Sequence, residues 1–331
     1  MRHEPKKKRF CAGLQINPKH FSIVVSVVFI ATLPLILKLP IFVFAFLQVL
    51  FCYYIMSQGL NLMAGYAGYL CFGQSVFFGI GAYTAALLTI YTGLPAYFVW
   101  PLATLPAALF ALGLGAVVLR LRGIYFAIST VALNFIFQLS FSIAPYTGGA
   151  HGIMLPLPPF SPIMTEYIFY EIALFTALAS TFVCYWVSRS RFGLGLMAIR
   201  EDEEACERFG VNTTKLKILA FTLSGCVTGL AGGIYSAYNL FIDPTTVFNM
   251  SISMFTIACV ILGGLGTVEG PLVGSIIFVC LSESLRYSLG TQIEGLHMVI
   301  FGCVSLAVIV FLREGIIGTL KKKYPNLIYL L

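Results

Sequence analysis

The chain has 331 residues, of which 59% are hydrophobic and only 10% are charged. This composition excludes an ordinary soluble domain and is typical of an integral membrane protein. The formal net charge is +7. The basic residues gather at the ends of apolar segments, where they determine membrane topology, so nucleic acid is not expected as a partner.

The apolar segments predict an all-α, polytopic transmembrane bundle of about ten helices, with eight as the lower alternative, because each reaches the roughly 20 residues needed to cross a bilayer. Residues 1–19 are expected to form a basic cytoplasmic N-terminus, and residues 20–331 a single transmembrane domain. Basic clusters at 6–9 and 321–323 place both ends in the cytoplasm, which requires an even number of crossings. The expected spans are 20–38, 41–64, 70–91, 95–119, 123–143, 167–187, 217–241, 250–265, 271–288 and 295–312.

Two glycine-rich stretches, 59–87 and 261–275, predict broken segments, because glycine weakens the interior of a helix. Breaks at 65–73 and 263–270 are expected to line or gate a translocation path, with close helix packing as the equal alternative. Polar side chains inside apolar segments either face such a path or bond between helices. The candidates for a path or gate are Asn61, Gly65, Gly68, Gln74, Asn134, Gln138, Gly263, Gly264, Gly266 and Glu269.

A proline-rich segment, 145–166, is expected to be extended and semi-rigid, since it holds five prolines. It is either a docking surface for an external partner or an ordinary connector. By contrast, the glycines at 225, 229, 232 and 233 have the three- and four-residue spacing that is typical of close packing between helices.

Residues 189–217 hold 11 of the 33 charged residues, and apolar segments flank them on both sides. We call this stretch the charged loop, and it must lie in water. Asp202 is expected to cap a helix over 203–209 that ends at Gly210 in the C′ position. Asn212 is expected to cap the next helix.

The predicted helix at 203–209 carries an apolar stripe. Ala205, Cys206 and Phe209 fall on one face at helical spacing. A short helix with an apolar stripe outside the bilayer needs a protein partner to cover it. The charged loop is therefore predicted to dock on another subunit.

Signatures of catalysis and of metal binding are missing. The nine cysteines are isolated and show no C-x-x-C spacing, so neither a disulfide framework nor a metal site is expected. The chain carries no Walker-type phosphate loop, nucleophile elbow or H-E-x-x-H motif, and we predict a transport protein without a cofactor rather than an enzyme. An ion-coupled carrier would need buried acids, for which the sequence offers little beyond Glu269 and Glu283.

Residues 204–210 read Glu-Ala-Cys-Glu-Arg-Phe-Gly and resemble the E-A-A-x-x-x-G loop of ABC importer permeases, with Cys206 in the position of the second alanine. Four longer blocks, 59–88, 147–153, 192–225 and 263–275, resemble the branched-chain amino-acid ABC permeases in family order. Within that family the chain looks most like the longer of the two permease subunits.

This resemblance implies a permease for branched-chain amino acids in a bacterial-type cytoplasmic (inner) membrane. Urea, short amides or another small polar solute are alternatives, and an ion-coupled secondary transporter is the alternative of a different class. The implied partners are cytoplasmic ATP-binding subunits that hydrolyse ATP, a homologous second permease and an extracytoplasmic substrate-binding protein. The residues implied to contact the ATP-binding subunit are Glu203, Glu204, Ala205, Cys206, Phe209 and Gly210.

Overall fold

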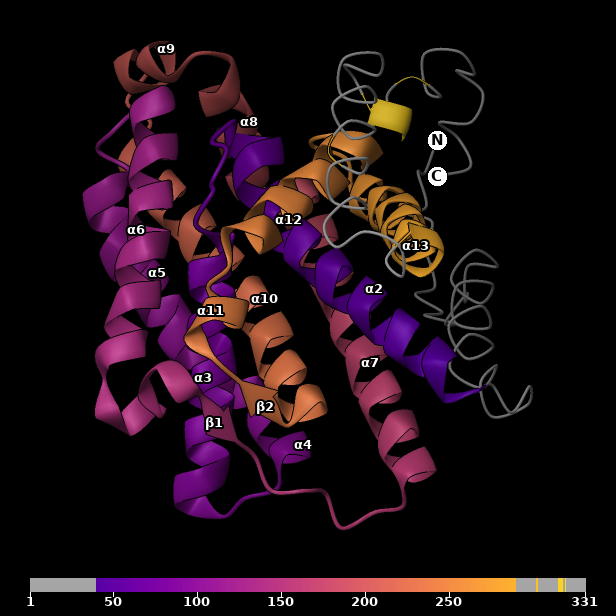
Figure 1. The fold of residues 1–331 in the computed structure, drawn as a ribbon. Helices are drawn as coiled ribbons and strands as arrows, with labels where there is room; N and C mark the ends of the chain where they lie inside the picture. The colour runs from indigo at the N-terminus through magenta and orange to yellow at the C-terminus, as the bar shows by residue number, and fades with distance from the viewer. Residues whose placement is uncertain (1–39, 290–301, 303–314, 318, 320–331) are drawn as a thin grey trace, which may run out of the picture. The chain divides into compact units, whose positions relative to one another are not determined.

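The computed structural model describes residues 40–289, 302, 315–317 and 319, and the described residues that follow Pro40 form one compact unit. Predictions for residues 1–19, for the span 20–38 and for most of the span 295–312 lie outside the described residues. Within the described part the fold is almost entirely helical (Figure 1), as the sequence predicts.

The helices and strands follow the apolar pattern of the sequence closely. In chain order they are α2 (Ile41–Leu60), η1 (Asn61–Ala67), α3 (Gln74–Thr92), α4 (Ala96–Val99), η2 (Trp100–Ala103), α5 (Thr104–Val118), α6 (Ile124–Ile143), η3 (Pro145–Thr147), η4 (Gly149–His151), β1 (Ile153–Met154), α7 (Pro162–Arg189), α8 (Arg191–Glu201), α9 (Glu203–Arg208), α10 (Thr213–Asn239), β2 (Phe241–Ile242), α11 (Pro244–Val247), α12 (Met250–Gly263) and α13 (Gly270–Leu289).

Seven helices of the described part are long and apolar enough to cross a membrane. They match the seven predicted spans from 41–64 to 250–265. The next predicted span, 271–288, coincides with α13, whose apolar stretch is shorter, Gly270–Leu285. The seven spanning segments are Ile41–Ala67, Gln74–Thr92, Ala96–Val118, Ile124–Ile143, Pro162–Arg189, Thr213–Asn239 and Pro244–Gly263.

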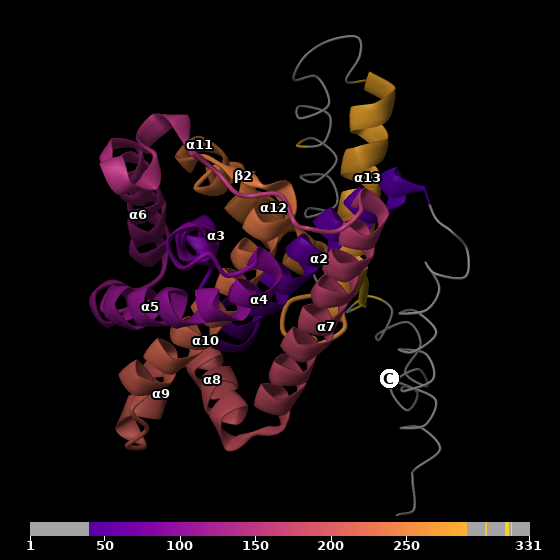
Figure 2. The same ribbon diagram turned by 90° about the horizontal axis from the view of Figure 1, so that it is seen from below.

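Helix α10 lies at the centre of the bundle, in contact with α2, α3 and α5 (Figure 2). Glycine residues allow α10 to lie this close to its neighbouring helices. A Cβ atom on Gly232 would lie 2.0 Å from the carbonyl oxygen of Phe78, and one on Gly81 would lie 2.1 Å from that of Gly229. The predicted close packing of the α10 glycines is therefore confirmed.

Helix α6 lies at the edge of the bundle (Figure 2), and only 17% of its 18-residue apolar stretch is buried inside the protein. Its outward side chains are large and apolar, as contact with lipid or with another membrane protein requires.

The proline-rich segment, 145–166, is partly anchored. β1 pairs antiparallel with β2, with Ile153 opposite Ile242. Helix α7 begins at Pro162 rather than at the predicted residue 167, because the Ser161 side chain accepts a hydrogen bond from the Met164 N–H and caps the helix.

Candidate coupling and gating site

The first predicted break is present at the end of α2. This helix continues into a π-helix, η1, and ends at Gly68, whose φ of 79° is left-handed. Helix α3 begins only at Gln74, later than the predicted residue 70, because the break extends to Gly73. π-Helical turns occur frequently at functional sites.

The second predicted break lies between α12 and α13. α12 ends at Gly263, and the following glycines Gly264 and Gly266 have φ angles of 122° and 79°, which favour glycine. Glu269 lies in this break, and its backbone carbonyl accepts the Leu272 N–H in the first turn of α13. The position of both breaks is therefore confirmed.

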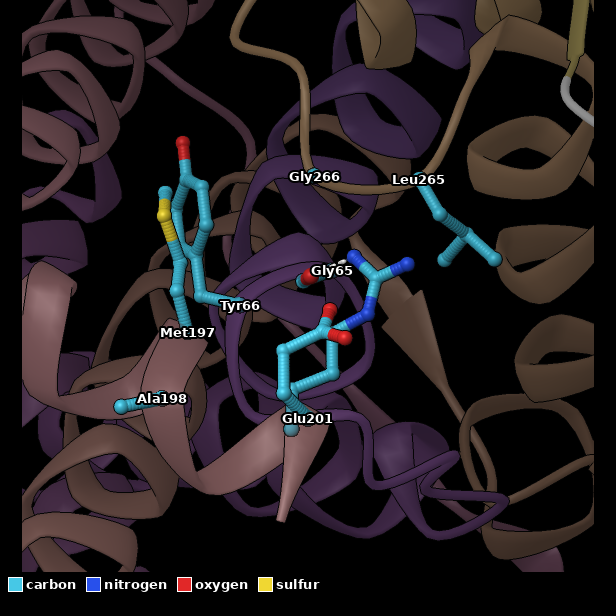
Figure 3. Close-up of a pocket in the computed structure, with 8 residues that line it drawn as sticks. Gly65, Tyr66, Met197, Ala198, Glu201, Leu265 and Gly266 are labelled. Carbon is cyan, nitrogen blue, oxygen red and sulfur yellow. Dashed lines mark hydrogen bonds between the residues drawn. The ribbon is translucent and has the colours of Figure 1, made fainter.

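The two breaks lie against each other. A Cβ atom on Gly65 would lie only 2.6 Å from the backbone nitrogen of Gly266, and Figure 3 shows the two glycines on facing segments. The Asn61 side chain joins the breaks. Its Nδ2 donates to the carbonyl of Thr267 at 2.8 Å, and its Oδ1 accepts the Gly266 N–H at 2.9 Å. One turn earlier, Gln58 Nε2 donates to the Val268 carbonyl at 3.0 Å.

Three other polar candidates lie elsewhere. Gln74 bonds between helices, since its Nε2 donates to Ser224 Oγ at 3.0 Å and its Oε1 accepts from Thr228 at 2.7 Å. Gln74 thus follows the alternative in which a polar side chain bonds between helices. Asn134 and Gln138 lie on α6. Asn134 is buried with its Oδ1 unpaired, and Gln138 is partly exposed.

The charged loop contains both of the predicted helix caps. Asp202 Oδ1 accepts the Ala205 N–H at 2.9 Å, and Asn212 Oδ1 accepts the Lys215 N–H at 3.0 Å. Each side chain satisfies a backbone donor that its helix leaves unpaired. Both predicted helix starts are thus confirmed.

Gly210 ends α9 as predicted. Its φ is 82°, its N–H donates to the Glu207 carbonyl at 3.0 Å, and the Val211 N–H donates to the Cys206 carbonyl at 3.1 Å. This pair of bonds is the Schellman arrangement with Gly210 at C′.

The predicted apolar stripe needs correction. Cys206 is 9% exposed and packs inward, whereas Phe209 is 87% exposed. Helix α9 ends at Arg208, one residue earlier than predicted, and Phe209 is its C-cap. One of the two side chains is buried and the other exposed, so they do not form a single exposed stripe. Of the apolar residues expected to face a partner, the structure presents Phe209.

A buried ion pair fixes α9 to the start of α10. Lys217 is the one charged residue of the described part that is fully buried, with its side chain 3% exposed. Its Nζ lies 2.6 Å from Glu203 Oε1 and 3.2 Å from the Tyr69 hydroxyl, which in turn donates to Glu203 Oε2 at 2.5 Å. The ammonium also lies 5.0 Å from the centroid of the Tyr69 ring.

Charges around this pair keep Glu203 ionised. Burial by itself raises the pKa of the Glu203 carboxyl, but hydrogen bonds from Lys217 and Tyr69, and the charges of Lys217 and Arg122, outweigh it and lower the pKa below the usual value. Arg122 lies 3.6 Å from Glu203 and 3.3 Å from Glu207. Burial and the neighbouring Glu203 raise the pKa of the Tyr69 phenol, which therefore stays a donor.

The charged loop also reaches the first break. On α8, Arg200 Nη1 donates to the Gly65 carbonyl at 2.7 Å. A cavity of about 390 Å³ opens between α8 and the two breaks (Figure 3), lined by Gly65, Tyr66, Met197, Ala198, Arg200, Glu201, Leu265 and Gly266. No group of three or more His, Cys, Asp or Glu side chains in the described ranges could hold a metal ion.

Comparison with known proteins decides the family. The family described as "Branched-chain amino acid transport system / permease component" matches residues 42–312. The chain belongs to this family.

Relatives within the permease family agree. The chain is 34% identical over 261 residues to "High-affinity branched-chain amino acid transport system permease protein LivM" of Salmonella typhimurium and, equally, to that of Escherichia coli. These matches cover 71% of this chain and 61% of each relative. A "Probable branched-chain amino acid transport permease protein LivM" of Methanocaldococcus jannaschii is 26% identical over 313 residues, covering 80% of this chain and 90% of the relative. No solved structure matches the chain.

Sequence reasoning missed three residues of this site, Tyr69, Arg200 and Lys217. Glu203, which the resemblance implies to contact an ATP-binding subunit, binds within the chain to Lys217 and Tyr69. A lysine embedded in the apolar start of a membrane helix is a signal that could have revealed Lys217. Neither Tyr69 nor Arg200 carries a local signal, because their partners are distant in sequence.

We expect Gly210→Val to block transport without blocking membrane insertion. The cause is backbone strain alone, since nothing lies within 4 Å of a Cβ at this position. A left-handed conformation costs an ordinary residue about 1–2 kcal/mol, and a β-branched one more. Uptake is measured at equal membrane levels, with Gly210→Asn as the control, because asparagine tolerates this conformation. Normal uptake by the valine variant would contradict the assignment of Gly210 as a joint that requires the left-handed conformation.

Proposed function

We propose that this chain is the transmembrane permease subunit of an ATP-driven importer for branched-chain amino acids. Membership of the permease family and the names of its relatives support the class and the solute. The observation that supports coupling to an ATP-binding subunit is that one end of α9 is exposed and the other is held by the bundle. Its C-cap Phe209 is almost fully exposed, while Glu203 in its first turn binds to the bundle.

The exposed part of α9 fits a helix-in-groove contact with a cytoplasmic ATP-binding subunit. Phe209 supplies an apolar anchor. Glu204 on the same helix is exposed and makes loose ion pairs with Arg122 and Arg208. Aromatic anchors dominate the free energy of such interfaces. ATP hydrolysis is assigned to that separate subunit.

The buried ion pair explains how a movement of α9 enters the membrane. If α9 moved alone, Lys217 would remain buried without Glu203, and breaking such a pair costs about 3–5 kcal/mol. Helix α9 therefore moves together with α10 and with Tyr69, which lies within the first break. Movement of the ATP-binding subunits would thus reach the glycine breaks and switch the path between inward- and outward-facing states.

The remaining partners follow from the same proposal. A homologous second permease would complete the pore, and an external binding protein would deliver the amino acid. The permease would lie in the cytoplasmic (inner) membrane with both termini in the cytoplasm. The test is purification of the tagged chain from its native membrane under gentle detergent, with mass spectrometry of what stays bound. An ATP-binding subunit and a second permease are expected, and a chain recovered alone that performs ion-coupled uptake would overturn the proposal.

We expect Phe209→Ala to weaken retention of the ATP-binding subunit about tenfold, because truncating an interface anchor costs more than 1 kcal/mol. The matched control is Leu157→Ala. Leu157 is 83% exposed and lies in the segment between β1 and α7, at the opposite end of the bundle from α9 (Figure 1). Both variants are purified identically and the ratio of subunits is quantified. Equal retention in the two variants would remove Phe209 from the interface.

A further inference from the structure

We propose that Arg200 is a positioning residue that ties α8 to both glycine breaks, so that movement of the charged loop reaches the gate through this side chain. The proposal rests on the proposed function, because it assigns a role within ATP-driven transport. It concerns a residue outside the E-A-A-type heptad and outside the candidates for the translocation path.

Arg200 caps a helix that belongs to another part of the chain. The helix formed by α2 and η1 ends at Ala67, so the Gly65 carbonyl is one of its last four and has no donor within a regular helix. Arg200 Nη1 supplies that donor at 2.7 Å. The guanidinium also places a positive charge at the negative end of the helix dipole.

The same side chain lies across both breaks. A Cβ atom on Gly68 would lie 3.0 Å from Arg200 Cγ, and one on Gly266 would lie 3.1 Å from Arg200 Nη1. Both glycines have a φ of 79°, so each break turns sharply where the arginine passes. Asn61 then bonds the second break to the first. A displacement of Arg200 therefore acts on both breaks together.

A movement of α8 would displace Arg200, which lies near the C-terminal end of this helix. Helix α8 is separated from α9 by a single residue, Asp202, so a movement of α9 must be followed by the end of α8. Leu196 and Ile199 are buried and hold α8 against the bundle. Since these two residues anchor the helix, Arg200 can be replaced without removing the apolar contacts of α8.

This link differs from the buried ion pair. Glu203 and Lys217 are largely shielded from water and join α9 rigidly to α10. Arg200 is an exposed residue that makes one charge-assisted hydrogen bond to a backbone carbonyl, which can break and re-form during a transport cycle. Loss of the Arg200 link should therefore leave the chain folded and the ATP-binding subunit bound, but release the gate from the charged loop.

The test uses the complete complex in proteoliposomes, with ATP, the binding protein and radiolabelled leucine as the probe. For Arg200→Gln we expect normal retention of the ATP-binding subunits, continued ATP hydrolysis, and at least a tenfold rise in ATP consumed per leucine imported. Arg200→Lys keeps a cationic donor on a flexible stem and should recover part of the coupling. The matched control is Arg191→Gln, which changes an exposed arginine at the start of α8 and should leave the ratio unchanged.

An unchanged ratio for Arg200→Gln would overturn the proposal, as would a ratio equally raised by Arg191→Gln. Loss of the ATP-binding subunits from the Arg200→Gln complex would also overturn it, because the role would then be assembly. Failure of the proposed function gives a different result. In that case the unaltered complex would itself show no ATP-dependent leucine uptake.

Discussion

Gly65→Ala is expected to reduce uptake at least tenfold while the protein still reaches the membrane. A methyl group on this residue would lie 2.1 Å from Asn61 Oδ1 and 2.6 Å from the backbone nitrogen of Gly266. The asparagine could turn away, but only by giving up its two bonds to the second break. The backbone of Gly266 could move only by separating the two breaks. Overpacking of this kind costs typically 1–3 kcal/mol.

The matched control for Gly65→Ala is Gly113→Ala. Gly113 lies within α5, and nothing is within 4 Å of a Cβ atom there, so the same change meets open space. Alanine favours a helix more than glycine by roughly 1 kcal/mol, and this variant should be at least as stable as the unaltered chain. Uptake is normalised to the amount of inserted protein. If both variants transport equally, the contact between the two breaks plays no part in transport.

Glu203→Gln should lower the free energy of unfolding by about 3 kcal/mol or more, because it leaves Lys217 buried beside a neutral amide. The matched control is Glu207→Gln on the same helix. Glu207 is 44% exposed and pairs with the exposed Arg122, and such surface pairs contribute about 0–1 kcal/mol. The double variant Glu203→Gln/Lys217→Met should recover much of the loss, since no charge is then stranded. Thermal unfolding in detergent compares the four proteins. A loss for Glu203→Gln as small as that for Glu207→Gln would contradict the buried pair.

The pH dependence gives the same prediction a second readout. The folded-state pKa of Glu203 lies below its ordinary value of 4.5, so the pair stabilises the fold fully above that pH. This contribution is lost as the pH falls through the lower, folded-state pKa. We therefore expect the difference in stability between the unaltered chain and Glu203→Gln to be constant near neutrality and to shrink below about pH 4.5. A difference that shrinks between pH 8 and 6 would point to another group.

The sequence by itself determined the local features of this protein. Runs of apolar residues specified the spanning helices, because a chain in lipid must satisfy its backbone within each helix. Asp202 and Asn212 marked helix starts, Gly210 marked an end, and the glycine clusters marked the breaks. Each of these signals acts within a few residues, through a cap, a turn or the backbone freedom of glycine, and the structure confirms them.

Only the tertiary structure decided what these features do together. Arg200 and the Gly65 carbonyl that it caps are 135 residues apart, and Asn61 and the Gly266 N–H that it accepts are 205 apart. No local pattern encodes such a distance, since it depends on how α2, α8 and α12 pack. The same packing buried Cys206 and placed Glu203 against Lys217. Local chemistry thus fixed the parts of the candidate site, and the packing of distant helices determined which side chains bind to one another and which, like Phe209, stay exposed.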